Sequence, residues 1–227
     1  MSISPEKTKE ILCSHGVTTL YHANTVATSL SFLRAGGLLS RGYVEDIKAV
    51  QTPQQSDGTD QAFGIYYDIF FDSVDIHQRT RNLNYYGPVT FVYSVEVLDL
   101  PGIEVKVTKQ NPIYWTQDMD EAAKYFTNEA ELEFHYEVGN FQEHITLCNM
   151  HTPLPFVPYL QEILLEDPQI ANTAYFERAV EALSAELRRQ GIVAPLNVRA
   201  CPDNCGCHAA YKEHKEGYTY HRFKLDM

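Results

Sequence analysis

The stretch TTLYHANT, residues 18–25, decides how the first part of the chain folds. Its first five residues have the composition of a short strand. Asn24 and Thr25 follow at once, and both residue types favour the cap position at the start of a helix. Apolar residues then recur at helical spacing until Gly36. The sequence therefore predicts a strand over 18–22, a capped helix and a glycine stop.

Strand-like and helix-like patterns alternate through the rest of the chain. Residues 89–97 carry apolar side chains at every second position and predict the clearest strand. Further strands are expected at 103–107, 132–138 and 145–147, and helices at 118–126, 158–165 and 168–189. The polar, turn-rich residues 51–61 predict a surface loop or a mobile flap.

These elements predict an α+β fold with a mixed or antiparallel sheet core and flanking helices. We expect a single domain over residues 1–227. Its core is expected within 1–150, and 151–227 is expected to form a helical extension that contains cysteines and histidines.

Composition and charge restrict the function classes. With 227 residues and 44% apolar content the chain can bury a full core. Its 18 basic and 30 acidic residues give a net charge of 18 − 30 = −12, which disfavours general adhesion to nucleic acid or to anionic membrane. The sequence lacks an apolar run long enough for a membrane span and an apolar N-terminal leader, so we expect a cytoplasmic protein without a membrane partner.

Common nucleotide-site and hydrolase motifs are missing from the sequence. It contains neither a Gly-x-Gly-x-x-Gly after a strand, nor a P-loop, nor a Gly-x-Ser-x-Gly elbow. A nucleotide-using enzyme with this sequence must hold its ligand in another way.

Several separated segments share an order with one family. They are LYHANT at 20–25, GLLSR at 37–41, DIHQR at 75–79, GPVTFV at 87–92 and FQEHI at 141–145. In this order the chain resembles the ADP-ribosyltransferases, in particular the DarT-like group, over about residues 18–147. The neighbours of Glu143 and the region between Gly42 and Asp75 depart from the family pattern.

The resemblance implies a transferase that uses NAD as its donor, and it implies two sets of site residues. Glu143 is expected to be catalytic together with Arg79, which can pair with the NAD pyrophosphate or an acceptor phosphate. The carboxylate of Glu143 would stabilise an oxocarbenium-like ribose and take the proton of the acceptor. The residues expected to bind NAD are His22, Tyr21, Asn24, Thr25, Ser40, Arg41, Tyr85 and Tyr86.

Each of these residues also has a purely structural interpretation. His22 can be a structural histidine at a strand end, and Glu143 a solvated acid at a sheet edge. Arg79 can pair with Asp72 or Asp75 as an ordinary surface charge, and the tyrosines can serve packing.

The resemblance further implies the acceptor and the partners. A base of RNA or single-stranded DNA is the expected acceptor, in a toxin of a toxin–antitoxin or phage-defence module with a neutralising antitoxin protein. A local basic groove of Arg79, Arg81, Lys106 and Lys109 would then hold the strand. Two alternatives remain open: transfer to a protein, and a non-catalytic binding module of the same shape, in which Glu143 would point away from His22.

A second group of residues suggests a metal. Cys201, Cys205, Cys207 and His208 lie close together near the end of the chain, with His214 and His221 downstream. Thiolates and imidazoles are the ligands of structural zinc, although this spacing matches no standard zinc motif. Reduced thiols without a metal are the alternative.

Overall fold

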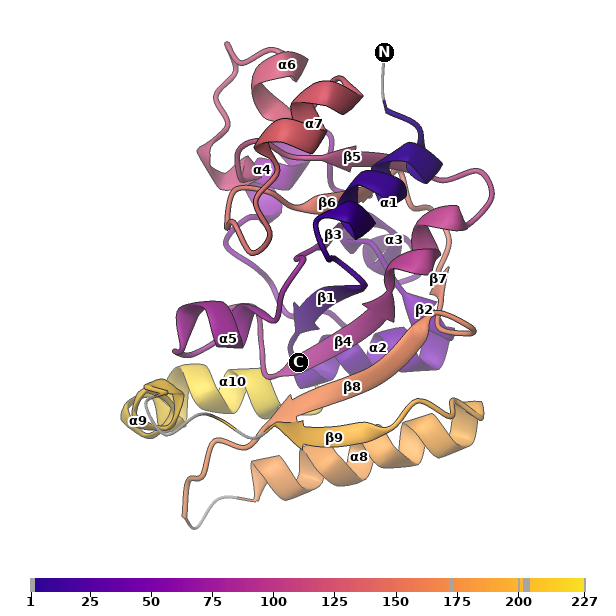
Figure 1. Cartoon of the computed structure of the whole chain (residues 1–227). Helices are drawn as coiled ribbons and strands as arrows, with labels where there is room; N and C mark the ends of the chain where they lie inside the picture. Colours follow the sequence, from indigo (N-terminus) through magenta and orange to yellow (C-terminus); the bar gives the residue numbers. More distant parts are fainter. Residues whose placement is uncertain (1–2, 172–173, 200, 202–204, 227) are drawn as a thin grey trace.

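Two sheets form the centre of the molecule (Figure 1). The computed structural model describes residues 3–171, 174–199, 201 and 205–226. The strands are β1 (Thr19–Asn24), β2 (Gly37–Leu38), β3 (Ile69–Phe71), β4 (Val89–Ser94), β5 (Glu104–Val107), β6 (Ile145–Cys148), β7 (Leu154–Pro155), β8 (Leu160–Glu166) and β9 (Leu196–Arg199).

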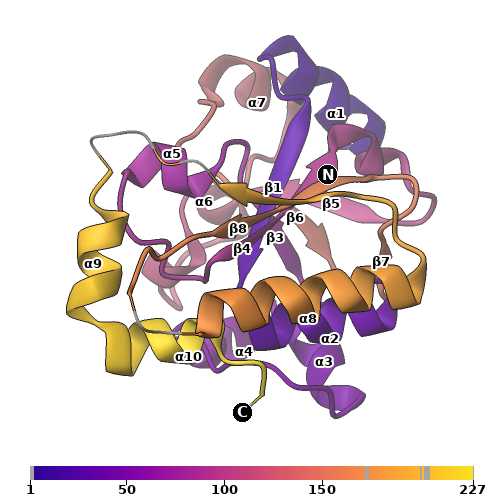
Figure 2. The ribbon, with the colours of Figure 1, turned by 90° about the horizontal axis from the view of Figure 1, so that it is seen from below.

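Helices surround these sheets (Figures 1 and 2). The α-helices are α1 (Pro5–Ser14), α2 (Val26–Ala35), α3 (Arg41–Asp46), α4 (Asp57–Ala62), α5 (Ile76–Thr80), α6 (Glu121–Lys124), α7 (Glu129–His135), α8 (Tyr175–Gln190), α9 (Cys207–Glu213) and α10 (Tyr220–Phe223). Shorter turns of other helix types are η1 (Val95–Asp99), η2 (Pro112–Tyr114) and η3 (Lys215–Thr219).

The larger sheet has the strand order β1-β4-β8-β9. β4 pairs antiparallel with both β1 and β8, and β9 pairs in parallel with β8. The smaller of the two central sheets, β3-β6-β5, is antiparallel throughout, and β2 and β7 form a separate two-stranded antiparallel sheet. A bridge between Tyr21 and Asp72 connects β1 to the end of β3, so the two sheets meet at the strand that the opening motif predicts.

The segment after β1 folds as the sequence predicts. The Thr25 side chain caps α2 by accepting a hydrogen bond from the Thr28 N–H, and Gly36 ends the helix at a φ of 76°. A left-handed residue at this position is common after helices, and glycine adopts it without strain. In Figure 2, α8 runs alongside α2. Between helix and sheet, Phe32 packs on Phe91, which stacks on Phe156.

The predicted helix over 158–165 is wrong, because this segment forms β8. Ile163 and Leu165 are buried between β4 and β9, whereas Gln161 is exposed. In so short a run, polar residues at 161 and 162 beside apolar ones resemble a helical face as much as a strand. The last third of the chain therefore supplies two strands to the larger sheet in addition to its helices.

The predicted strand over 132–138 is also wrong, because residues 129–135 form α7. Asn128 accepts a hydrogen bond from the Glu131 N–H at 2.9 Å, and the Glu131 carboxylate reaches back toward residues 127 and 128. This reciprocal cap starts a helix. Leu132 is consequently fully buried while Phe134 is 83% exposed, although a strand would place both on one face.

The α+β class with a mixed sheet and flanking helices is confirmed. The predicted strand at 89–97 stops at Ser94, where η1 begins, and the predicted helix at 118–126 is shortened to α6. Among the described helices, none combines the length and the apolar character that crossing a membrane requires.

Candidate functional site

A cavity of about 820 Å³, measured to its open mouth, lies where β1 meets the smaller sheet. Five of the residues expected to bind NAD line it: Tyr21, His22, Asn24, Arg41 and Tyr86. The opening motif thus forms one wall of the cavity.

His22 presents a free acceptor at this wall. Its Nδ1 lies 2.9 Å from the Phe70 carbonyl oxygen, and because a carbonyl can only accept, Nδ1 must carry the proton. Burial lowers the pKa of His22, so the ring is neutral near pH 7. Nε2 then has a bare lone pair, and it has no hydrogen-bond partner in the described part of the chain. A ligand N–H or O–H can donate to it.

Asp72 is the carboxylate most closely surrounded by other polar groups of the cavity. Arg79 donates to its Oδ1 at 2.8 Å. The Nδ1 of His144, which also lines the cavity, lies 3.7 Å from the same oxygen. Arg79 packs its guanidinium over the Phe141 ring and is not among the lining residues. It therefore acts on the cavity through Asp72.

The hydrogen bonds around Asn111 fix the tautomer of His144. Asn111 Oδ1 accepts from the Ile113 N–H, so its Nδ2 is the group that donates to His144 Nε2 at 3.0 Å. Burial lowers the pKa of His144, which keeps the ring neutral. Its proton is therefore on Nδ1, on the side of Asp72. His22 therefore has a hydrogen-bond acceptor at Nε2, and His144 has a donor at Nδ1.

Part of the predicted flap forms another wall of the cavity. Gln54, Ser56 and Asp60 line it, and α4 includes Asp57, which receives two hydrogen bonds from the Arg41 guanidinium. Burial raises the pKa of Asp60 to about 6. The same cause raises the pKa of Asp68, another lining residue, to about 6.

Glu143 does not line the cavity. Its carboxylate accepts hydrogen bonds from the Glu137 N–H at 2.7 Å and from Asn140 Nδ2 at 2.9 Å. Neighbouring side chains on an extended chain point to opposite sides, and here His144 takes the side of the cavity. Burial raises the pKa of Glu143. In this structure Glu143 stabilises the loop that precedes β6.

Three other expected NAD contacts lie outside the lining. Thr25 and Ser40 are helix caps, and the Ser40 hydroxyl also donates to the Met150 carbonyl at 2.7 Å. Tyr85 is 68% exposed and lies against Tyr218. Next to Tyr86, Gly87 has a φ of +145°, and a Cβ there would lie 2.2 Å from the Asn24 carbonyl oxygen. Because Gly87 has no side chain, Tyr86 and Asn24 can lie close together in the same wall of the cavity.

Three of the four cations of the predicted basic groove are paired with acids, beginning with Arg79, which pairs with Asp72. Lys106 has Glu104 and Glu121 within 4 Å, and Lys109 pairs with Glu131. Among the described lining residues of the cavity, the single lysine or arginine is Arg41.

The cavity has residues that the sequence interpretation missed, namely Asp60, Asp68, Asp72, Asn111 and His144. Asp72 was available as the residue that follows β3, but it was considered only as a partner of Arg79. His144 was visible as the neighbour of Glu143. Asn111 lies in a loop without a motif, and the sequence held no signal for it.

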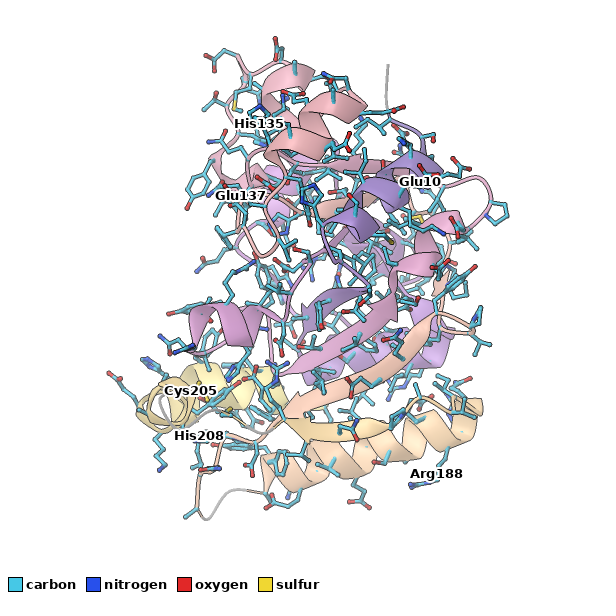
Figure 3. All side chains as sticks on the ribbon, in the orientation of Figure 1. Glu10, His135, Glu137, Arg188, Cys205 and His208 are labelled. Carbon is cyan, nitrogen blue, oxygen red and sulfur yellow. The ribbon has the colours of Figure 1, made fainter. Side chains whose placement is uncertain are left out.

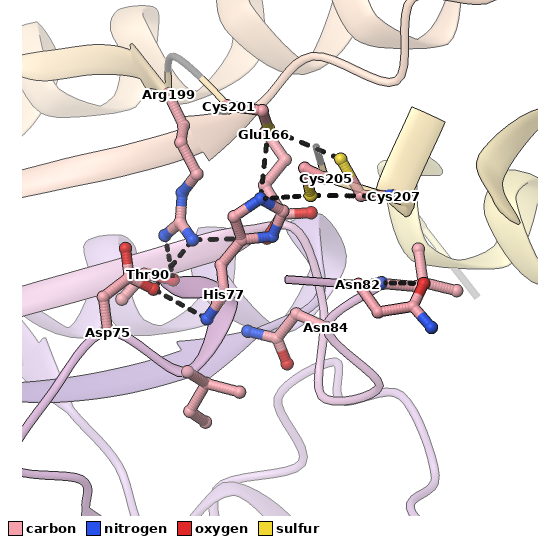
Figure 4. Close-up of polar contacts among 12 residues, drawn as sticks. Asp75, His77, Asn82, Asn84, Thr90, Glu166, Arg199, Cys201, Cys205 and Cys207 are labelled. Atoms are coloured by element: carbon pink, nitrogen blue, oxygen red, sulfur yellow. Dashed lines mark hydrogen bonds and ion pairs between the residues drawn. The ribbon is translucent and has the colours of Figure 1, made fainter. Parts of the chain in front are cut away.

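A separate group of side chains gathers beyond the end of β9 (Figure 4). The cysteine–histidine cluster consists of His77, Cys201, Cys205 and Cys207, whose ligand atoms all lie within 4.8 Å of one another. This set can hold a metal ion. The three predicted cysteines come together as expected, but His77 from α5 takes the place expected for His208. Figure 3 shows Cys205 and His208 near α9, and Glu137 toward the other end of the molecule.

Comparisons with known proteins give a structural but no sequence match. No family model and no curated protein matches the chain. The solved structure of DarT from Thermus sp. 2.9 in complex with ADP-ribosylated ssDNA is similar, with a TM-score of 0.52 and 12% identity over 81% of this chain and 95% of that one. The complexes of the same protein with NAD+ and carba-NAD+ have TM-scores of 0.48 at 14% and 15% identity, over 81% of this chain and 96% of those chains. The expected resemblance is thus confirmed at the level of the fold, which is DarT-like.

Proposed function

We propose that the protein binds NAD+ in the cavity and transfers its ADP-ribose to a base of a nucleic acid. The observation that carries this proposal is the cavity wall formed by Tyr21, His22 and Asn24, the residues of the ADP-ribosyltransferase-like opening. The similar fold of a DarT complex that contains ADP-ribosylated ssDNA supports it.

The charge of the cavity suits the nicotinamide end of NAD+. Asp60, Asp68 and Asp72 line it, whereas its cation Arg41 is already paired with Asp57. The nicotinamide ring of NAD+ carries a positive charge, and that charge moves to the ribose as the bond to nicotinamide breaks. Carboxylates near the ribose stabilise this developing charge.

The reaction needs one carboxylate and few other groups. The bond between ribose C1′ and the nicotinamide nitrogen breaks, and its electron pair leaves with neutral nicotinamide. A nitrogen of the acceptor base forms the new bond to C1′ and gives up a proton. We infer that Asp72 faces the ribose and receives this proton, because it lines the cavity and is held by Arg79.

His22 is the proposed orienting residue. Its free Nε2 can accept a hydrogen bond from the carboxamide of nicotinamide or from a ribose hydroxyl. Tyr86 on the same wall is the candidate that stacks on nicotinamide; its burial raises the pKa of its hydroxyl to about 12, so the ring stays neutral.

A second candidate function is a non-catalytic NAD- or nucleotide-binding module of the same fold. The observation that favours it is the orientation of Glu143, whose carboxylate is held by Glu137 and Asn140 instead of facing His22. In that case the cavity would bind its ligand without breaking it.

Labelled NAD+ distinguishes these functions. We expect purified protein, incubated with NAD+ labelled on its adenylate part, to transfer label to single-stranded DNA or RNA and to release an equal amount of nicotinamide. Label found on protein alone would contradict transfer to a nucleic-acid base. Binding of NAD+ without transfer or nicotinamide release would establish the second candidate, and the absence of binding would refute both.

Two variants separate the two carboxylates. Asp72→Asn is expected to lower the transfer rate by about 10²–10⁴-fold, and Glu143→Gln to lower it by less than about tenfold. Both keep the shape of the side chain, and circular dichroism verifies the fold. If Glu143→Gln loses transfer and Asp72→Asn keeps it, Glu143 is the catalytic carboxylate. Its loop would then have to move to bring the carboxylate into the cavity.

We propose further that the transfer is toxic and that a partner protein neutralises it, as in toxin–antitoxin or phage-defence modules. Expression of the protein in a bacterial host should arrest growth, and Asp72→Asn should relieve the arrest. Equal arrest by both forms would contradict a toxic role of the transfer.

A further inference from the structure

The ligand atoms of the cysteine–histidine cluster have the spacing of a tetrahedral metal site. His77 Nε2 lies 3.1 Å from Cys201 Sγ and 3.2 Å from Cys205 Sγ, and the Sγ atoms of Cys201 and Cys207 are 3.4 Å apart. Bonds of about 2.3 Å to sulfur and about 2.0–2.1 Å to nitrogen imply tetrahedron edges of about 3.6–3.8 Å. These three separations would lengthen by a few tenths of an ångström to accept zinc, and pairs near the 4.8 Å limit of the cluster would shorten by about 1 Å.

The chemistry of the ligands favours zinc over other ions. Thiolates and imidazole bind zinc, whereas calcium and magnesium prefer oxygen ligands. All five cysteines of the chain are free, and the 3.4 Å between Cys201 and Cys207 is far longer than the about 2.05 Å of a disulfide. Four protein ligands would complete the coordination and leave no open position, as in structural zinc sites.

Groups around His77 hold its ring in the orientation that a metal requires. Its side chain is 1% exposed, and its Nδ1 lies 3.3 Å from Oε1 of Glu166, which is also 1% exposed. The two atoms are close but not hydrogen-bonded. A carboxylate this near to Nδ1 favours the proton on that nitrogen and leaves the Nε2 lone pair for the metal. The His77 N–H is bound by Asp75 at 3.0 Å, so backbone and ring are both fixed.

A buried cation, Arg199, partly offsets the negative charge around the cluster. Three thiolates and a zinc ion carry a net charge of −1, and Glu166 adds another. The buried Arg199 lies 3.6 Å from Glu166 and 2.7 Å from Asp75 (Figure 4). Tyr211 from α9 donates a hydrogen bond to the other Glu166 oxygen. This second layer of polar groups is typical of metal sites.

We propose that His77, Cys201, Cys205 and Cys207 bind one structural zinc ion, which fastens the C-terminal segment to α5. The ion would connect residues more than 120 positions apart, since His77 and Cys201 differ by 124. α5 begins at Ile76, which lines the cavity, so the same ion supports one wall of the candidate site. This inference is independent of the proposed function.

Metal analysis of the full chain tests the proposal. Protein purified without chelators from cells grown with zinc should contain one zinc per chain by elemental mass spectrometry. After replacement of zinc by Co²⁺, intense visible absorption of a tetrahedral thiolate site should appear. Wild-type protein that contains no metal and takes up none, or that has a Cys201–Cys207 disulfide when purified under reducing conditions, would overturn the proposal.

Variants test the identity of the ligands. His77→Ala and Cys205→Ser should lose the zinc, and His77→Cys should keep it as a four-cysteine site. His208→Ala is the matched control, because it neighbours Cys207 but is not in the cluster, and it should keep the full amount of zinc. Zinc lost in His208→Ala and kept in His77→Ala would refute the ligand set. If His77→Ala does not fold, the zinc contents of His77→Cys and His208→Ala decide whether His77 or His208 is the ligand.

Glu166→Gln tests the surroundings. It removes the charge beside His77 Nδ1 and should weaken the affinity for zinc about 10–100-fold, measured by competition with a chelating dye. An unchanged affinity would contradict the role of Glu166 in orienting His77.

Discussion

The cavity and the cysteine–histidine cluster both collect polar groups in the interior, but they satisfy them differently. In the cavity wall, His22 Nε2 is buried and lacks a hydrogen-bond partner among the described residues. In the cluster, the four ligand atoms lie within 4.8 Å of one another, with Glu166, Arg199 and Tyr211 beside them. A cavity is suited to a ligand that comes and goes, and a compact set of metal ligands to a permanent structural role. Changes at the cluster should therefore act on stability, and changes at the cavity on binding.

The largest effect is expected from Arg199→Met. It leaves the buried carboxylates of Asp75 and Glu166 without their cation, so the free energy of unfolding should fall by about 3–5 kcal/mol. Urea unfolding measures the change, with Arg188→Met on the exposed side of α8 as the control. A loss no larger than that of the control would break the assignment of a structural role to this region.

Gly87→Ala should have the next largest effect. The added Cβ would lie 2.2 Å from the Asn24 carbonyl oxygen, at a φ that is strained for alanine. We expect a loss of about 2 kcal/mol or more in stability, together with weaker NAD+ binding because Tyr86 must move. Gly191→Ala is the matched control: its φ is +65°, but nothing lies within 4 Å of the added Cβ. If both variants lose the same stability, the close contact between Gly87 and Asn24 is unimportant.

His22→Ala tests the contribution of the cavity wall to NAD+ binding. It removes the free acceptor in the cavity, and we expect the Kd for NAD+ to rise about tenfold. The midpoint of thermal unfolding should also fall, because the variant loses the hydrogen bond to the Phe70 carbonyl and the ring contacts with Phe32 and Phe71. Calorimetric titration measures the affinity, and His135→Ala at an exposed position of α7 serves as the control. An unchanged Kd would remove His22 from the proposed site.

The smallest effect concerns pH. Because burial raises the pKa of Asp68 to about 6 from 3.8, the folded state holds this proton more tightly than the unfolded state. The resulting stability is present below about pH 4 and is lost as the pH rises through about 6. Asp68→Asn removes this dependence, so its stability relative to wild type should increase by about 0.5–1 kcal/mol between pH 5 and pH 7.

Urea unfolding at a series of pH values measures this difference. Asp118→Asn is the control, since that exposed aspartate has its pKa lowered by the Thr116 hydroxyl and should show no such gain. If the difference in stability between Asp68→Asn and wild type does not change with pH, the Asp68 carboxylate of the wild type is well solvated in the cavity.

The sequence predicts the elements that local signals define. The Thr25 cap and the Gly36 stop determine α2, and three of the four cluster residues were visible from their spacing. Segments whose structure depends on distant partners were misjudged: β8 is a strand because β4 and β9 flank it.

The candidate site was predicted less completely than the fold. Five of the expected NAD contacts share the cavity: Tyr21, His22 and Asn24 lie on β1, Arg41 begins α3, and Tyr86 precedes β4. His77 joins the cluster through tertiary structure, across more than 120 residues, and the sequence carried no sign of this. Glu143 and His144 are neighbours in the sequence, but only His144 lines the cavity. The sequence motif alone does not show which of two adjacent side chains faces the site.

The position of β9 at the edge of the larger sheet has a consequence for self-association. An edge strand leaves backbone N–H and C=O groups open to pairing with another chain, and sheets can grow into aggregates in this way. β9 has only four residues, and Pro195, which lacks an N–H, immediately precedes it. A second chain that added here would gain few backbone hydrogen bonds. The short last strand thereby protects the sheet from uncontrolled extension.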